Sequence, residues 1–91
     1  MKFIRAHVIV SGEVQGVGFR FHTRIKARNL DLKGWIRNLD SGEVEAVFEG
    51  EEDKVKEMLE WCKKGPESAL VKDVKVDFEN YTGEFESFES D

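Results

Sequence analysis

The chain has 91 residues, of which 40% are hydrophobic and 36% charged. It is therefore long enough to bury one hydrophobic core, but not two, under a highly charged surface. Its net charge of −5, from 14 Lys and Arg against 19 Asp and Glu, disfavours non-specific binding to nucleic acid or anionic membranes. Cys62 is the only cysteine, which excludes an internal disulfide and a multi-cysteine metal site. A single cysteine is compatible with a reduced compartment or with a tolerant exterior, and we expect the cytoplasm by default.

The first half of the chain predicts a strand, a helix and a hairpin. Apolar residues occupy the even positions of Phe3 to Val10, a period of two that is typical of a half-buried strand. Glycines then interrupt the pattern before a helix-permissive run from about Arg20 to Asn29. Two further strands, Leu32 to Asn38 and Glu43 to Glu49, are separated by a turn-rich link of hairpin length. The inward stripe expected of the first helix is Phe19, Thr23, Ala27 and Leu30.

The second half predicts a helix and a strand, with a short strand after them. Acidic residues from Glu51 open the second helix, Lys63 and Lys64 end it, and Gly65-Pro66 stops it. Residues 72–80 alternate again as a strand, and residues 85–88 predict a short edge strand. The side chains expected to face the core are Val55, Met58, Leu59 and Cys62 in the helix and Val74, Val76 and Phe78 in the strand.

The order strand, helix, strand, strand, helix, strand is that of the ferredoxin-like fold. Right-handed crossovers place both helices on one face of an antiparallel sheet in this arrangement. We therefore expect an α+β sandwich, βαββαβ, with a possible short extra C-terminal strand and a single domain spanning residues 1–91. Since this fold carries many functions, it implies none by itself.

The segment from Gly12 to Arg20, GEVQGVGFR, joins the first strand to the first helix and is a candidate anion site. Closely spaced glycines before a helix allow successive N–H groups to turn toward one ligand, and Arg20 adds a charged fork of donors. The alternative is an ordinary strand-to-helix turn with a solvated arginine. The segment is neither a Walker loop nor a dinucleotide fingerprint, because Gly-Lys-Ser/Thr is missing and Phe21 stands where a third glycine belongs.

This segment resembles the first signature of the acylphosphatase family. Gly34-Trp35-Ile36-Arg37-Asn38, followed by Gly42-x-Val44 and Gly50, resembles the second signature. Each match spans several residues, the spacing between them fits, and the resemblance covers the chain from its first to its fourth predicted strand.

The resemblance implies an enzyme without metal or organic cofactor that cleaves an acyl phosphate, a small molecule, to a carboxylate and inorganic phosphate. It implies that Arg20 is the catalytic arginine and that Asn38 orients the attacking water. The resemblance also implies that a substrate phosphate oxygen takes the water's proton, which agrees with the lack of a strong base beside Asn38 in the sequence. The residues implied to bind the phosphoryl group are Gln15, Gly16, Val17, Gly18, Phe19 and Arg20.

Two positions and the C-terminal tail depart from the commonest family pattern. Ile36 replaces a smaller residue, and Asp31 stands where a glycine often ends the first helix, although Asp tolerates left-handed geometry better than most residues. The tail from Phe85 to Asp91 lacks the basic and aromatic ending common in relatives, which leaves the course of the last strand open.

Two non-catalytic functions compete with this interpretation. A phosphate or acyl-phosphate binding module would use Arg20 equally well, but it would not need the amide of Asn38. An RNA-binding domain of the same fold is disfavoured, because residues 43–49 are acidic with one Phe where an RNA-recognition strand is basic and aromatic.

The remaining polar and aromatic candidates have structural interpretations. His7 and His22 lack ligand spacing with any carboxylate pair, and Cys62 completes an apolar stripe, so we expect neither metal nor thiol chemistry. No apolar run is long enough for a signal peptide or a membrane span. We expect a monomer without nucleic-acid or membrane partners.

Overall fold

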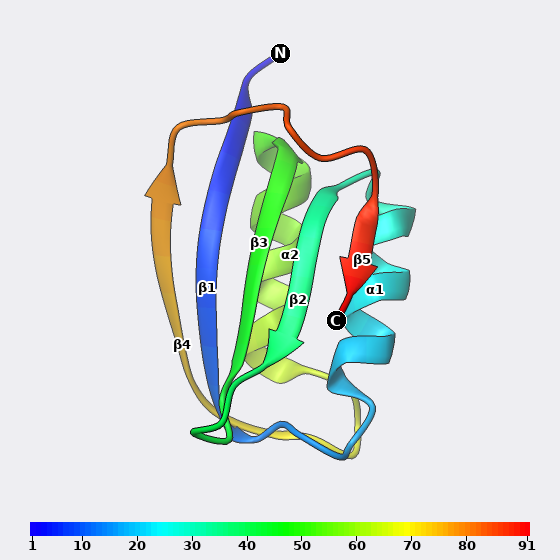
Figure 1. The fold of residues 1–91 in the computed structure, drawn as a ribbon, viewed down its shortest axis with the longest axis vertical. Helices are drawn as coiled ribbons and strands as arrows, with labels where there is room; N and C mark the ends of the chain where they lie inside the picture. Colours follow the sequence, from blue (N-terminus) through cyan, green and yellow to red (C-terminus); the bar gives the residue numbers. More distant parts are fainter.

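The computed structural model describes residues 1–91 as five strands and two helices. The strands form one sheet in the order β4-β1-β3-β2-β5, and both helices cover the same face of it (Figure 1). This is the expected α+β sandwich. The elements are β1 (Phe3–Glu13), α1 (Phe19–Asn29), β2 (Lys33–Asn38), β3 (Val44–Glu51), α2 (Glu52–Lys64), β4 (Leu70–Glu79) and β5 (Phe88–Ser90).

The extra C-terminal strand is present, but it runs parallel to its neighbour. β1 pairs antiparallel with β3 and β4, and β2 pairs antiparallel with β3, as expected. After β4 the chain crosses one end of the sheet to its other edge, and β5 then runs in the same direction as β2 (Figure 1). The sheet is therefore mixed rather than wholly antiparallel, and the strand covers Phe88–Ser90 rather than residues 85–88.

The core lies between the sheet and the two helices, and the expected helix stripes face it. All eight residues of those two stripes are buried. Burial raises the pKa of the Cys62 thiol to about 12, so this side chain behaves as a small hydrophobe. Asp31 has φ 58° just after α1, which is the left-handed conformation expected there. Neither helix is long and apolar enough to span a membrane.

Phe78 corrects one expectation, because its side chain is 60% exposed although it lies on the same face of β4 as Val74 and Val76. It lies near the end of β4, an edge strand with a single neighbour, β1. There it lines a surface hollow together with Phe3 and Tyr81. Val74 and Val76, earlier in the same strand, do pack against the core.

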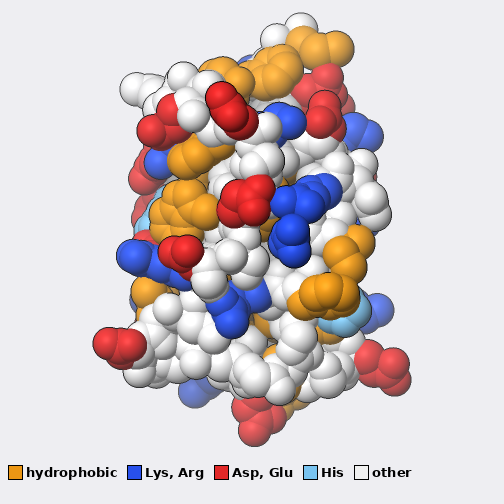
Figure 2. Space-filling view, turned by 45° about the vertical axis from the view of Figure 1, so that its right-hand side comes forward, with side chains coloured by type: hydrophobic (Ala, Val, Ile, Leu, Met, Phe, Trp, Pro, Cys, Tyr) orange, Lys and Arg blue, Asp and Glu red, His pale blue; other side chains and the backbone are white.

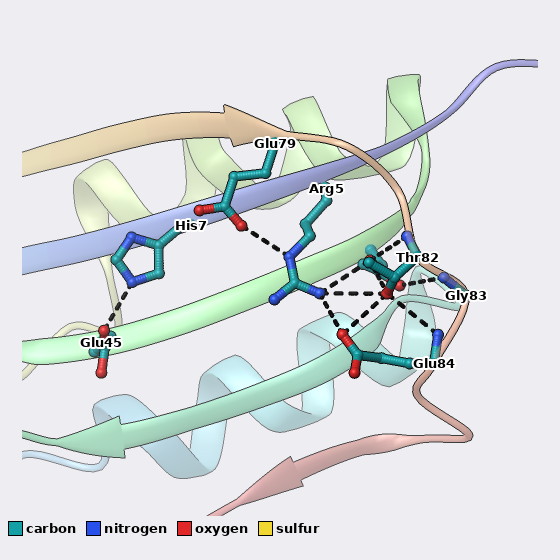
Figure 3. Close-up of polar contacts among 8 residues, drawn as sticks. Arg5, His7, Glu45, Glu79, Thr82, Gly83 and Glu84 are labelled. Atoms are coloured by element: carbon teal, nitrogen blue, oxygen red, sulfur yellow. Dashed lines mark hydrogen bonds and ion pairs between the residues drawn. The ribbon is translucent and has the colours of Figure 1, made fainter.

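At the end of the sheet that the β4–β5 link crosses, a buried carboxylate holds that link in place (Figure 3). Glu49 of β3 is 1% exposed and accepts hydrogen bonds from the backbone N–H groups of Thr82 and Gly83, at 2.9 and 3.1 Å. Arg5 of β1 donates to Glu49 at 3.2 Å and to Glu84 at 2.9 Å. These contacts attach the link to the two central strands.

Candidate active site

The loop between β1 and α1 lies at the opposite end of the sheet, beside the β2–β3 turn and the α2–β4 link (Figure 1). Its glycines Gly16 and Gly18 have φ 73° and 77°, in the left-handed region that glycine adopts without strain. Such residues allow a chain to turn consecutive N–H groups toward one point, as in backbone anion sites. We call residues 15–20 the cradle.

The backbone N–H groups of the cradle have no acceptor within the protein. None of those from Gln15 to Arg20 donates a hydrogen bond, and neither does the N–H of the next residue, Phe21. The first helical bond runs from the N–H of His22 to the carbonyl of Gly18 at 3.0 Å. Gly18 occupies the N-cap position, where a Ser or Asp side chain would have accepted one of these donors. The sequence thus leaves a row of donors available to an anion.

The charges around the two helix starts differ in sign. The first turn of α1 contains no acidic residue, and Arg20 is its second residue. The first turn of α2, in contrast, contains Glu52 and Asp53, which already balance the positive end of that helix dipole. Of the two helix N-termini, that of α1 is the one that keeps its positive potential for a ligand.

Arg20 is half-buried and takes part in no ion pair or side-chain hydrogen bond of the structure. Three other arginines are paired with carboxylates, namely Arg5 with Glu49, Arg28 with Glu89 and Arg37 with Glu45. The Arg20 guanidinium is thus free to bind a phosphate or carboxylate in the two-pronged manner typical of arginine.

Gln15 connects the cradle to the β2–β3 hairpin. Its side-chain Nε2 donates to the carbonyl oxygens of Leu39 and Glu43, at 2.7 and 2.9 Å. Leu39 directly follows Asn38, so this amide fixes the cradle against the strand end that carries Asn38. The sequence placed Gln15 in the cradle but contained no signal for its two partners, which are 24 and 28 residues away.

Two contacts on the other side hold the cradle to the body of the protein. The Ser68 hydroxyl donates to the carbonyl of Val17 at 2.7 Å. The Phe19 ring is buried in the core, 5.6 Å from the ring of Trp61 between centroids. Phe19 therefore has only its backbone available to a ligand, and its side chain anchors the start of α1. Neither Ser68 nor its role was predicted from the sequence.

Asn38 is the last residue of β2 and pairs with Val44 across the hairpin. It is exposed, and its side-chain amide makes no hydrogen bond within the protein. A neutral amide of this kind can both accept from and donate to a water molecule. The structure therefore brings both predicted parts of the site, the cradle and Asn38, to the same end of the sheet.

A family model for acylphosphatase matches residues 6–90. The chain belongs to the acylphosphatase family. It is 51% identical over 88 residues to the acylphosphatase of Pelotomaculum thermopropionicum, covering 97% of this chain and 96% of that one. It is 55% identical to the acylphosphatase of Trichormus variabilis, covering 90% and 81%. The structure of an acylphosphatase from Coxiella burnetii superposes with a TM-score of 0.93 at 39% identity, over 98% of this chain and 93% of that one.

Both acylphosphatase signatures have a definite place in this structure. The first forms the end of β1, the cradle and the start of α1. The second forms β2 up to Asn38 and continues through Gly42 into β3, which contains Val44 and Gly50. The two histidines make contacts of other kinds. His7 forms a hydrogen bond with Glu45 at 2.7 Å, which lowers the pKa of that carboxyl. The His22 ring packs against the ring of Phe21. No group of three or more His, Cys, Asp or Glu side chains is arranged to hold a metal ion.

Figure 2 shows the face around β5 and α1. Acidic and basic side chains are interspersed over it, without one continuous basic area. The positive potential of the acylphosphatase cradle comes from Arg20 and the free N–H groups.

Proposed function

We propose that this member of the acylphosphatase family hydrolyses acyl phosphates where the cradle meets the β2–β3 hairpin. The products are a carboxylate and inorganic phosphate. One observation carries the proposal: a run of backbone N–H groups without acceptors lies beside an unpaired arginine, and Gln15 fixes that run to the strand end of Asn38.

The cradle holds the phosphoryl group in this mechanism. The N–H groups from Gln15 to Phe21 and the fork of Arg20 donate to the phosphoryl oxygens, which carry the charge in the transition state. Because the glycine conformations and the Gln15 and Ser68 contacts already fix the loop, little reorganisation is needed when the substrate binds. Preorganisation of this kind makes an electrostatic contact effective in catalysis.

Asn38 places the attacking water. The water oxygen forms a bond to phosphorus in line with the bond that breaks, between phosphorus and the acyl oxygen. The electron pair of the broken bond leaves with the carboxylate, and the water's proton passes to a phosphate oxygen. An acyl phosphate is an activated anhydride with a good leaving group, so positioning and charge stabilisation suffice without a strong base.

We further propose that residues 1–91 act as one domain and as a monomer in the cytoplasm, without a metal or organic cofactor. Addition of a chelator should then leave the rate unchanged. Loss of activity with EDTA, followed by recovery on metal addition, would reject the cofactor-free mechanism.

The competing function is a phosphate-binding module that does not turn over. The decisive experiment measures hydrolysis of benzoyl phosphate and, separately, binding of inorganic phosphate by titration. We expect Arg20→Ala to lose both, and Asn38→Ala to keep phosphate binding while kcat falls about 100-fold or more. Arg28→Ala and Asn29→Ala, which change the same residue types elsewhere on α1, should keep both properties.

Normal turnover by Asn38→Ala would reject the water-placing role of that residue. Phosphate binding by the unmodified protein without any hydrolysis would favour the binding module instead.

A further inference from the structure

Two apolar side chains project into solvent directly beside the cradle. Phe21 is 60% exposed and Ile25 is 44% exposed. They are four residues apart on α1, so they lie next to each other on one face of the helix, away from the buried stripe. The core does not account for either side chain. Phe21 also follows Arg20 in the chain, and its own N–H belongs to the row of free donors.

The His22 ring joins this apolar face to the cradle. The rings of Phe21 and His22 meet edge to face, 5.3 Å apart between centroids at an angle of 79°. On its other side the His22 ring lies against Gly18, where a Cβ atom would be 3.4 Å from its Cδ2 atom. Gly18, His22 and Phe21 therefore form a continuous wall from the loop to the outer face of α1. Figure 2 shows hydrophobic side chains beside a histidine at the surface, on the lower right of that face.

The other large apolar side chains that are exposed lie outside α1. Phe3, Phe78 and Tyr81 line the hollow near the start of α2 and the end of β4. Leu70 is 66% exposed at the start of β4. Among the exposed large hydrophobic residues, Phe21 and Ile25 are thus the pair that continues directly from a residue of the cradle.

We propose that Phe21 and Ile25 form the subsite for the acyl group of the substrate, which makes aromatic or bulky apolar acyl phosphates better substrates than acetyl phosphate. This inference rests on the proposed function, because it needs the phosphoryl group in the cradle. With that group held by Arg20, an acyl group directed along α1 covers the exposed ring and removes apolar surface from water. A benzoyl ring has an aromatic face that packs on Phe21, whereas an acetyl group offers one methyl.

The contact with the acyl group is made in the bound substrate and persists in the transition state. A residue with this role changes KM and kcat/KM more than kcat. It also leaves the binding of inorganic phosphate unchanged, because phosphate has no acyl group. These two properties separate a substrate subsite from a residue that merely supports the fold of α1.

The test compares kcat/KM for benzoyl phosphate and for acetyl phosphate in four proteins: the unmodified chain, Phe21→Ala, Phe21→Ala with Ile25→Ala, and Phe78→Ala. Phe78 is an equally exposed aromatic control, at 60%, near the end of β4 that lies away from the cradle. For Phe21→Ala we expect the benzoyl value to fall about 5- to 10-fold, mainly through KM, and the acetyl value to change less than about twofold. The double variant should lose more, and Phe78→Ala should match the unmodified chain. Alanine favours an exposed helix position, so the variants in α1 should fold, and thermal unfolding checks all of them.

Equal losses for both substrates, or no loss for either, would overturn the subsite while the proposed function stands. If the unmodified chain hydrolysed neither substrate, the proposed function itself would fail and the subsite with it. Phe21→Leu, which keeps apolar surface without the ring, should give an intermediate benzoyl value. If the benzoyl values of Phe21→Leu and Phe21→Ala both equalled that of the unmodified protein, the subsite would be rejected.

Discussion

The two ends of the sheet present the same types of hydrogen-bond donor, backbone N–H groups and an arginine, but the protein supplies an anion for these donors at only one end. At one end, backbone N–H groups of Thr82 and Gly83 and the guanidinium of Arg5 all donate to the buried carboxylate of Glu49. At the other end, the cradle and Arg20 present comparable donors without an acceptor from the chain. The comparison teaches that such a nest is structural where the protein provides the negative charge, and open to a ligand where it does not.

The electrostatics of Glu49 show how strongly this kind of nest favours an anion. Burial acts to raise the pKa of its carboxyl, yet hydrogen bonds from Thr82, Arg5 and Gly83 outweigh that effect and lower the pKa below its ordinary value. A phosphoryl group bound in the cradle as proposed would meet the same types of donor, and the cradle is less buried than Glu49.

The largest effect is expected from Glu49→Ala, which removes the internal anion. Arg5 and the two N–H groups lose their shared partner, and we expect the free energy of unfolding to fall by about 3–5 kcal/mol, as for a broken buried pair. Activity per folded molecule should stay within about twofold, because the cradle lies at the other end of the sheet. Chemical denaturation and steady-state kinetics measure the two quantities.

Glu84→Ala is the matched control, since that carboxylate contacts Arg5 but its side chain is 57% exposed. It should cost less than about 1 kcal/mol. A large loss of turnover in Glu49→Ala at a temperature where it is folded would show that the two ends are coupled.

Gln15→Met tests the end of the sheet that carries the cradle. It keeps the side-chain length but removes the amide that donates to the carbonyl oxygens of Leu39 and Glu43 in the hairpin. We expect kcat to fall about 10- to 100-fold, since small displacements between positioned groups reduce rates strongly. The affinity for inorganic phosphate should change less than about threefold, because the N–H groups and Arg20 remain. Kinetics together with phosphate titration would detect this split.

Ser68→Ala is the comparison variant, since it removes the contact with Val17 without touching the hairpin. Its kcat should be reduced less than that of Gln15→Met. Equal losses of kcat and of phosphate affinity in Gln15→Met would mean that Gln15 supports the whole loop rather than its position relative to Asn38.

Alanine at Gly16, in the cradle, and alanine at Gly83, in the β4–β5 link, introduce similar backbone strain at the two ends of the sheet. Gly16 has φ 73° and Gly83 has φ 66°, so alanine at either position costs about 1–2 kcal/mol of stability. Gly16→Ala should also weaken phosphate binding about 5- to 10-fold, because its backbone belongs to the cradle, whereas Gly83→Ala should not. Calorimetric titration with phosphate distinguishes them; equal phosphate affinities would show that the cradle does not depend on that conformation.

The smallest expected effect is on the pH dependence of stability. The pKa of Glu49 is lower in the folded protein than its ordinary value of 4.5, so the carboxylate stabilises the folded state above pH 4.5. That contribution is lost as the pH falls below 4.5 through the folded pKa. Glu45, whose pKa is also lowered, acts in the same direction. Glu49→Gln should therefore show a smaller loss of stability between neutral and acid pH than the unmodified chain, and an identical pH dependence would contradict this account.

Local patterns predicted the elements well, because each helix and the central strands carry their own periodicity. The stripes of α1 and α2 and the left-handed Asp31 follow from a few neighbouring residues. Phe78 was predicted wrongly because alternation indicates a face and cannot tell whether anything covers that face near the end of an edge strand. The direction of β5 depends on where a long link crosses the sheet, which no residue within the strand encodes.

The candidate site divides in the same way. The glycine loop and Arg20 are contiguous in sequence, and the family resemblance supplied Asn38, whose role stays a prediction. The contacts of Gln15 with the hairpin, of Ser68 with the loop and of Arg5 with the link join residues far apart in the chain. Such pairings follow from tertiary packing, so the sequence alone could not reveal them.

The sheet has two edges, and the chain protects them differently. β5 covers the outer side of β2, while β4 leaves its own outer side without a partner strand. Along β4, positive and negative side chains alternate with valines, and they include Lys72, Asp73, Lys75 and Asp77. A second chain that added a strand there would have to bring its backbone against these charges. The charged edge thus opposes edge-to-edge aggregation.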